Sequence, residues 1–281
     1  MNEVGLGKAL QLARLSKGLT QQQLCQRADL SYSTLAKIER GAIKAPSIFT
    51  IEKIASTLGI ELKDILGNVS GLKGNTPKKT SKSGIKFVFF DINGCLVRFY
   101  HKAFTKIALE FSISSEDVET AFWHLNDAVC SGEISLDEFN RRLSDDLKID
   151  PINFKDYYLS SVEAMPGMIE LVNKISVDYE VGLISDIMPG FIDALIDKKL
   201  IPNLAYDAIV DSSVIKALKP ELKMFKAAET MSKLASSELL LIDDSRTNLA
   251  AADKLGWHVI WFNDTDPKDS INRIKTALEI H

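Results

Sequence analysis

The stretch IKFVFFDINGCL, residues 85–96, decides the fold of most of this chain. It is a short apolar run that reaches Asp91, passes through Asn93 and breaks into a turn at Gly94. A run this short, bounded by a turn signal, is more typical of a central parallel strand than of a helix. Active sites of open α/β sheets lie beyond the carboxyl ends of such strands. Asp91 is therefore placed where chemistry is expected, although a strand-end aspartate is also a common turn former.

Three later segments extend this pattern. They are EVGLISD at residues 180–186, Lys219-Pro220 followed by Phe225, and ELLLIDDSRTNLAAADKLGWHVIWF at residues 238–262. With the first stretch, these segments resemble in order and spacing the four motifs of the haloacid dehalogenase-like (HAD) superfamily, over roughly residues 85–265. The resemblance implies an α/β domain with a Rossmann-like parallel sheet.

The resemblance also implies a role for each matching residue. Asp91 would attack a phosphoryl group, Ser185 would hydrogen-bond a phosphoryl oxygen, and Lys219 would orient Asp91. Because phosphoryl oxygens are negative, attack by a carboxylate needs cations on both sides. The implied cofactor is Mg²⁺, with ligands from Asp91, the main-chain carbonyl of Asn93, Asp243 and Asp244. The alternative for residues 243–245 is that they only cap the helix that follows.

Asn93 departs from the family pattern, which has a second aspartate at this position. That aspartate protonates the leaving alkoxide and then helps water attack the aspartyl phosphate, and an amide can do neither. General acid–base catalysis contributes roughly 10²–10⁴-fold, so we expect weak or no phosphatase activity on ordinary monoesters. A donor with a good leaving group, such as an acyl phosphate or a phosphoanhydride, needs no proton at that step. Such a donor could leave Asp91 phosphorylated, as in a switch.

Two smaller departures accompany Asn93. Lys216 occupies a place that is often glycine in relatives, and it either tightens the loop near the phosphate or adds a cation. Cys95 replaces a family threonine and is expected to pack as a small apolar side chain.

The 93 residues between Asp91 and Ser185 are too many for one crossover helix. Helical spacing recurs near residues 101–111, 116–130, 136–147 and 153–162. The insert, approximately residues 98–163, is therefore predicted to be a helical cap, and it resembles the four-helix type that covers the pocket in many relatives. Candidate pocket residues are Arg98, Trp123 and His124, although an aromatic residue at helical spacing more often packs in a core.

The first 66 residues show a different pattern, that of five short helices. Helical spacing and capping signals predict a first helix that ends near residue 17, a second that opens after Thr20, a third from Ser31 to Gly41, a fourth after Ser47 and a fifth over residues 61–66. The stretch LTQQQLCQRADLSYSTLAKIERG, residues 19–41, resembles the phage-repressor (Xre/Cro) helix-turn-helix family. Asp29 stands where relatives often have glycine, and aspartate tolerates that left-handed backbone.

The third helix of this all-α domain is the expected recognition helix. Leu35 and Ile38 are expected to face the core, which turns the opposite face toward solvent. In such domains the amino-terminal part of this helix enters the major groove of double-stranded DNA. By resemblance, base contacts are assigned to Tyr32, Ser33 and Lys37, and phosphate contacts to Gln21, Ser31 and Lys44.

Charge follows the same division. Residues 1–84 carry 13 Lys and Arg against 6 Asp and Glu, a net charge of +7, so residues 85–281 carry −11 of the total of −4. Only the amino-terminal part is expected to be drawn to a polyanion. Between the domains, residues 67–84 are rich in Gly, Ser, Thr, Asn and Lys and are predicted to form a flexible linker. The predicted domains are residues 1–66 and 85–281.

Hydropathy and cysteine spacing limit where the protein can act and which metal sites it can form. No apolar run approaches the ~20 residues that span a bilayer, and Met1 leads into a polar helix, so we expect a cytoplasmic protein without a membrane partner. The three cysteines are scattered without metal-type spacing.

Two functions are compatible with these patterns. The first is a sequence-specific DNA-binding transcriptional regulator whose HAD-like domain binds, senses or is phosphorylated by a small phosphorylated metabolite. The alternative is a Mg-dependent phosphatase or phosphotransferase with a DNA-binding or dimerising amino-terminal domain. Since one recognition helix reads only one half-site, we expect a homodimer.

Overall fold

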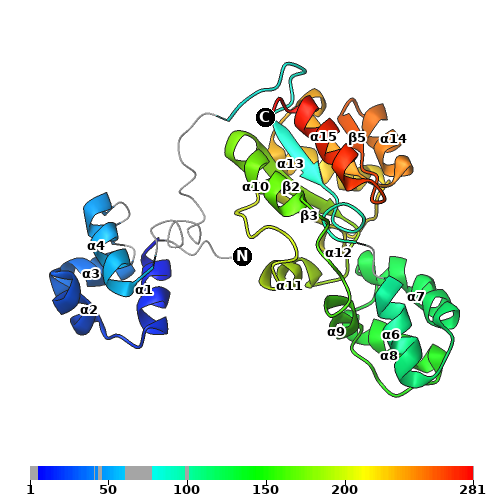
Figure 1. The fold of residues 1–281 in the computed structure, drawn as a ribbon, viewed down its shortest axis with the longest axis horizontal. Coiled ribbons are helices and arrows are strands. Elements are labelled where there is room, and N and C mark those ends of the chain that lie inside the picture. Colours follow the sequence, from blue (N-terminus) through cyan, green and yellow to red (C-terminus); the bar gives the residue numbers. More distant parts are fainter. Residues whose placement is uncertain (1–5, 41, 44–45, 61–77, 99–100, 281) are drawn as a thin grey trace. The chain divides into compact units, whose positions relative to one another are not determined.

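The computed structural model describes residues 6–40, 42–43, 46–60, 78–98 and 101–280. The chain divides into two compact units, residues 1–77 and residues 78–281 (Figure 1). Among the described residues, no helix has the length and apolar character needed to cross a membrane.

The first unit is helical, as predicted. Its described helices are α1 (Leu6–Ser16), α2 (Gln21–Ala28), α3 (Tyr32–Glu39) and α4 (Ile48–Leu58). Thr20 and Gln23 form the expected capping box of α2, and the Ser31 hydroxyl accepts a hydrogen bond from the main-chain N–H of Thr34 at the start of α3. Asp29 ends α2 in the left-handed region, with a φ of 48°. The predicted helix over residues 61–66 lies outside the described residues.

A buried ion pair ties three of these helices together. Nε and Nη2 of Arg14, on α1, donate to the two carboxylate oxygens of Glu39 at 2.8 Å each. Gln21 Nε2, at the start of α2, donates to the same carboxylate at 2.8 Å. The side chains of Arg14 and Glu39 are only 6% and 1% exposed, so neither charge can be satisfied by water if its partner is lost.

We predict that Glu39→Ala destabilises the first unit by about 3–5 kcal/mol, because it leaves the Arg14 guanidinium buried without its partner. All three tryptophans, Trp123, Trp257 and Trp261, lie in the second unit. In urea unfolding followed by far-UV circular dichroism, the loss of helix in the first unit should therefore move to a lower urea concentration. The midpoint of the transition in tryptophan fluorescence, which reports on the second unit, should not change. Gln26→Ala, at an exposed position of α2, is the matched control. Equal urea midpoints of the helical transition in the two variants would show that the ion pair contributes nothing to the stability of the first unit.

The second unit is an α/β domain around one parallel sheet. Its strands are β1 (Phe87–Phe90), β2 (Glu180–Ser185), β3 (Ala208–Asp211), β4 (Leu239–Asp243) and β5 (His258–Trp261). They run in the order β3-β2-β1-β4-β5. All neighbours are parallel, with Phe90 opposite both Leu183 and Ile242. The carboxyl ends of β1, β2 and β4 therefore meet at one edge of the sheet.

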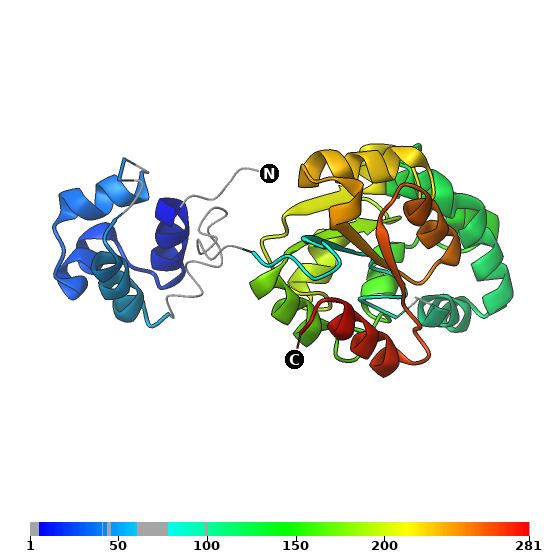
Figure 2. The ribbon, with the colours of Figure 1, turned by 90° about the horizontal axis from the view of Figure 1, so that it is seen from above.

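Helices cover both faces of this sheet (Figure 2). Because side chains alternate along a strand, Val88 and Phe90 pack on one face and Phe87 and Phe89 on the other. The first face is covered by α10 (Met168–Asp178), α11 (Phe191–Asp197) and α15 (Pro267–Ala277). The second is covered by α13 (Leu222–Ser232) and α14 (Arg246–Lys254). The shorter helices are α12 (Ser212–Ile215) and η1 (Ser236–Glu238). The predicted fold class is confirmed.

A separate group of helices is inserted between β1 and β2, as expected for the cap (Figure 1). It consists of α6 (His101–Phe111), α7 (Ser115–Cys130), α8 (Leu136–Leu147) and α9 (Phe154–Leu159). Buried aromatic rings join the four helices, with Phe122 at 4.9 Å from Phe104, 5.9 Å from Phe139 and 5.0 Å from Phe154 between ring centroids. These rings belong to the same buried cluster as Val88 and Phe90, so the interior of the cap is continuous with the core on one face of the sheet.

Residues 78–84, the last part of the predicted linker, lie against the second unit. The Lys79 ammonium pairs with the Asp178 carboxylate at 2.6 Å, and the main-chain N–H of Lys79 donates to the Asp178 carbonyl. Ser81 is buried, and its hydroxyl accepts from the main-chain N–H of Ile85 at 3.0 Å. This part of the predicted tether is therefore held on the domain that follows it.

Candidate active site

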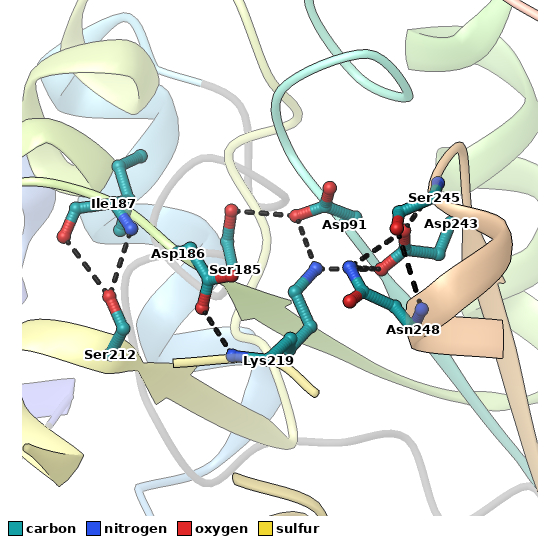
Figure 3. A network of polar contacts seen from close by, with 9 residues as sticks. All are labelled: Asp91, Ser185, Asp186, Ile187, Ser212, Lys219, Asp243, Ser245 and Asn248. Atoms are coloured by element: carbon teal, nitrogen blue, oxygen red, sulfur yellow. Dashed lines mark hydrogen bonds and ion pairs between the residues drawn. The ribbon is translucent and has the colours of Figure 1, made fainter. Parts of the chain in front are cut away.

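Three predicted site residues meet at the carboxyl edge of the sheet (Figure 3). Asp91 directly follows β1, and its Oδ1 accepts a hydrogen bond from Ser185 Oγ at 2.7 Å. The same oxygen lies 2.9 Å from Lys219 Nζ. Both partners are almost inaccessible, and the parallel register of β1 and β2 is what brings Ser185 beside Asp91.

Lys219 holds two carboxylates at once. Its Nζ lies 2.9 Å from Asp91 and donates to Asp243 Oδ2 at 2.7 Å. Burial lowers the pKa of Lys219, but the charges of Asp243 and Asp91 outweigh burial and raise it overall. The ammonium therefore stays charged. The main-chain N–H of Lys219 donates to Asp186 Oδ1 at 2.9 Å. This hydrogen bond fixes the position of the loop that contains Lys219.

Asp243 is held from the other side by the start of α14. Its Oδ1 accepts from the main-chain N–H of Ser245 at 2.8 Å, and Asn248 Nδ2 lies 3.2 and 3.3 Å from its two oxygens. Ser245 also caps α14, as the capping alternative predicts, and the same turn holds the Asp243 carboxylate. Asn248 stands in the quoted motif, but sequence reasoning gave it no role.

The residues predicted to bind metal also converge. Carboxylate oxygens of Asp91, Asp243 and Asp244 lie within 4.8 Å of one another. Gly94, at a φ of 89°, makes room for Asp244, since a Cβ at this glycine would lie 2.2 Å from Asp244 Oδ2. Burial, together with the charges of Asp91 and Asp243, raises the pKa of Asp244 to about 7. A set of crowded, hard oxygen donors fits the ligand preference of Mg²⁺.

Asn93 is joined to the cap. The hydroxyl of Tyr158, on α9, donates to Asn93 Oδ1 at 2.8 Å. Burial raises the pKa of Tyr158 well above its ordinary value, so this hydroxyl is a permanent donor rather than a proton source. Sequence reasoning missed Tyr158, because nothing in the local pattern of α9 shows which of its faces meets a turn 65 residues earlier.

A small cavity of about 10 Å³ lies between the cap and the turn that contains Asn93. It is lined by Asn93, Asn126, Cys130, Phe154, Tyr158, Asp186, Ile187, Met188 and Phe191. The three candidates named from the sequence, Arg98, Trp123 and His124, do not line this cavity. Trp123 is 43% exposed and donates to Glu119, His124 lines an open groove on the outside of the cap, and Arg98 is exposed. The residues of α7 that line the cavity are Asn126 and Cys130, which lie nearer the carboxyl end of this helix than Trp123 and His124 do.

The two smaller departures have simple structural explanations. Lys216 adopts the left-handed region with a φ of 59°, which is why glycine is favoured there. Its Nζ donates to the carbonyl of Gly132 at 2.8 Å, just beyond α7. The Lys216 ammonium therefore binds the end of this cap helix to the core of the second unit. Cys95 is fully buried, as expected for a packing role.

In the first unit, α3 presents the predicted faces. Leu35 and Ile38 are buried, whereas Ser33 and Lys37 are exposed and Tyr32 is 53% exposed. The polar groups of Gln21 and Ser31 already have partners within the domain, in the Glu39 carboxylate and the cap of α3. Lys44 lies outside the described residues.

Residues 88–262, more than half of the chain, match the haloacid dehalogenase-like hydrolase family. The chain therefore belongs to this family. Residues 10–65 match a helix-turn-helix family. The fusion that the sequence predicted is thus confirmed.

Two relatives align with the helix-turn-helix part. The immunity repressor protein of Bacillus phage phi105 is 38% identical over 77 residues, which are 27% of this chain and 53% of the repressor. The HTH-type transcriptional regulator SlrR of Bacillus subtilis (strain 168) is 37% identical over 60 residues, 21% of this chain and 40% of that protein. The chain thus spans about half of these relatives or less.

Solved structures share the fold of the second unit. A HAD-like family hydrolase from Porphyromonas gingivalis has a TM-score of 0.57 at 22% identity, covering 68% of this chain and 97% of its own. A magnesium complex of a HAD family enzyme from Bacteroides thetaiotaomicron has a TM-score of 0.57 at 20% identity, with coverages of 68% and 99%. A complex of the Bacteroides enzyme with magnesium and inorganic phosphate has a TM-score of 0.54 at 21% identity, with coverages of 64% and 96%. At these identities the likeness shows the fold.

Proposed function

We propose that the chain is a sequence-specific DNA-binding transcriptional regulator whose HAD-like domain binds, or is phosphorylated by, a small phosphorylated ligand. One observation carries this proposal: the site keeps its nucleophile and its cation but has a carboxamide, Asn93, at the position of proton transfer. Such a site can recognise a phosphoryl group and even accept one, yet it lacks the group that would complete hydrolysis.

Each remaining residue has a binding task in this proposal. Ser185 Oγ can turn from Asp91 to donate to a phosphoryl oxygen, and Lys219 orients Asp91 and partly offsets the rise in the Asp91 pKa that burial causes. The residues that would hold Mg²⁺ are Asp91, Asp243, Asp244 and the main-chain carbonyl of Asn93. When bound, Mg²⁺ would neutralise phosphoryl oxygens in a site that is otherwise rich in negative charge.

The alternative function, a Mg-dependent phosphatase or phosphotransferase, is favoured by the intact Asp91–Lys219–Asp243 arrangement. Against it, Asn93 has no acidic proton, and its partner Tyr158 is a weaker acid than an ordinary tyrosine, because burial raises its pKa. We therefore rank regulation first.

The DNA-binding half of the proposal is supported by the exposed face of α3 and by the positive charge of the first 84 residues. We assign base contacts to Tyr32, Ser33 and Lys37. A homodimer belongs to this proposal, since two recognition helices are needed to read a two-fold operator.

We predict that Tyr32→Ala combined with Lys37→Ala abolishes specific DNA binding while the chain stays folded. Both side chains are exposed and pack little, so stability should change by less than about 0.5 kcal/mol. Gel retardation with a promoter fragment selected by the wild-type chain measures the loss. Lys53→Ala, which removes an exposed cation from α4, is the control. Unchanged retardation by the double variant would place the base contacts elsewhere.

We predict that Mg²⁺ raises the midpoint of thermal unfolding of the second unit, and that Asp244→Asn abolishes this rise. Saturation at 100 times the dissociation constant corresponds to about 2.7 kcal/mol. Without Mg²⁺, Asp244→Asn should be at least as stable as the wild type, because it removes one of three crowded carboxylates. Tryptophan fluorescence follows the transition, and Asp264→Asn, at an exposed position, is the control. An equal Mg²⁺ response in both variants contradicts the ligand assignment.

We predict that the wild type releases phosphate from methyl phosphate very slowly with Mg²⁺, and that Asn93→Asp raises the rate roughly 10²-fold or more, since an alkoxide leaving group needs a proton. Phosphate release is the measurement. Asn126→Asp is a matched control, because it adds a carboxylate to the same cavity at a different position. Rapid multiple turnover by the wild type would reverse our ranking of the two functions.

A further inference from the structure

We propose that Trp261 is a positioning residue of the candidate metal site and that it acts through the main chain of Asp244. Trp261 is the last residue of β5, and its indole N–H is a donor only, so it cannot itself bind a cation. The indole instead fixes the point from which the Asp244 carboxylate reaches the site. The inference rests on the proposed function only in the assignment of Asp91, Asp243 and Asp244 as Mg²⁺ ligands.

The acidic turn after β4 is held from β5. The two strands are parallel neighbours with Asp243 opposite Trp261, and the main-chain N–H of Phe262 donates to the Asp243 carbonyl at 2.9 Å. One residue later, Trp261 Nε1 donates to the Asp244 carbonyl, also at 2.9 Å. Two consecutive carbonyls of this turn therefore have fixed donors, the first from the main chain and the second from a side chain.

The carboxylate of Asp244 is held less directly than those of the other two acidic residues. Asp91 and Asp243 both pair with the Lys219 ammonium. Within the part of the chain that the structure describes, no side chain donates to the Asp244 carboxylate, although one of its oxygens lies within 4.8 Å of oxygens of the other two. Like charges at this distance repel one another. The position of the Asp244 carboxylate therefore depends on its main chain, and the Trp261 indole holds this main chain at its carbonyl.

A stacked guanidinium keeps the indole in place. The Cζ atom of Arg246, the first residue of α14, lies 4.0 Å from the centre of the Trp261 ring, and that of Arg273, on α15, lies at 6.0 Å. A guanidinium over an aromatic ring is attracted to its negative face. Because Arg246 follows Asp244 by two residues, this stacking joins the end of β5 to the helix that begins after the acidic turn. It therefore resists rotation of the indole away from the Asp244 carbonyl.

Mg²⁺ and Ca²⁺ respond differently to the placement of a ligand. Mg²⁺ requires nearly ideal octahedral geometry with short bonds, whereas Ca²⁺ accepts longer bonds and a more flexible geometry. Loosening the Asp244 carboxylate should therefore weaken Mg²⁺ binding more than Ca²⁺ binding. A general loss of structure, by contrast, would weaken the binding of both cations alike.

Titration calorimetry of the full chain with each cation tests the proposal. Trp261→Phe keeps an aromatic ring beneath Arg246 but removes the N–H, and we expect about tenfold weaker Mg²⁺ binding, with Ca²⁺ affinity changed by less than about threefold. Trp257→Phe is the matched control, because it removes an indole N–H that donates to Glu229 instead, at 3.2 Å. Arg246→Ala leaves the N–H of Trp261 in place but frees its ring, and it should weaken Mg²⁺ binding about threefold.

A second readout follows the indole itself. In the chain labelled with ¹⁵N-tryptophan, Trp123, Trp257 and Trp261 each give one indole N–H resonance in the NMR spectrum. The resonance that is missing from the spectrum of Trp261→Phe belongs to Trp261. We expect this resonance to shift on addition of Mg²⁺ to the wild type and to stay in place in Asp244→Asn, because the cation then lacks the ligand whose main chain the indole holds.

The outcomes separate this inference from the function on which it rests. Wild-type Mg²⁺ affinity in a folded Trp261→Phe variant overturns the proposal, and so does an equal loss of Mg²⁺ and Ca²⁺ affinity. If Trp261→Phe does not fold, unchanged Mg²⁺ affinity in Arg246→Ala overturns it. A wild type that binds no Mg²⁺ removes the ligand assignment and this inference with it. Since neither readout uses DNA or a phosphoryl ligand, failure to bind either one contradicts the proposed function and leaves this inference intact.

Discussion

The second unit is organised around one buried ammonium. Lys219 lies between Asp91 and Asp243, at 2.9 and 2.7 Å, with its side chain 1% exposed. Burying a charge costs several kcal/mol unless it is paired and hydrogen-bonded. Here three charges are buried together, and the surplus negative charge, increased by Asp244, is what makes the site suited to a further cation. Strand order, the Gly94 turn and the start of α14 all serve to keep these groups within contact distance of one another.

Much of this arrangement could be predicted because the carboxyl ends of neighbouring parallel strands lie side by side along one edge of the sheet. Once residues 85–96, 180–186 and 238–243 are identified as neighbouring strands, Asp91, Ser185 and Asp243 must meet at their carboxyl ends. The helix-turn-helix could be predicted for a similar reason, since capping residues and periodicity are local signals. Thr20, Ser31 and Ser47 each cap the helix that they were expected to cap.

What could not be predicted depends on contacts between distant elements. The Arg14–Glu39 pair joins α1 to α3, and nothing in the local sequence of either helix shows that these two residues are partners. The lining of the cavity depends on how the cap is rotated on the core, and an aromatic residue on an amphipathic helix gives no sign of which packed face it will occupy. Trp123 and His124 were therefore the candidates, whereas the cavity is lined by Asn126 and Cys130 of α7 and by Tyr158 of α9.

The pair of Asn93 and Tyr158 links the chemistry of the site to the cap. A carboxylate at position 93 would accept the same hydrogen bond from Tyr158, and this bond would stabilise the charged form and lower its pKa, so that less of it would be protonated and available as a general acid near neutral pH. A carboxamide accepts the bond without that conflict, because it has no proton to lose. Its amide nitrogen is then left to donate, which suits a phosphoryl oxygen rather than a proton-seeking alkoxide. The hydrogen bond between Tyr158 and Asn93 thus joins the cap directly to the turn that follows Asp91.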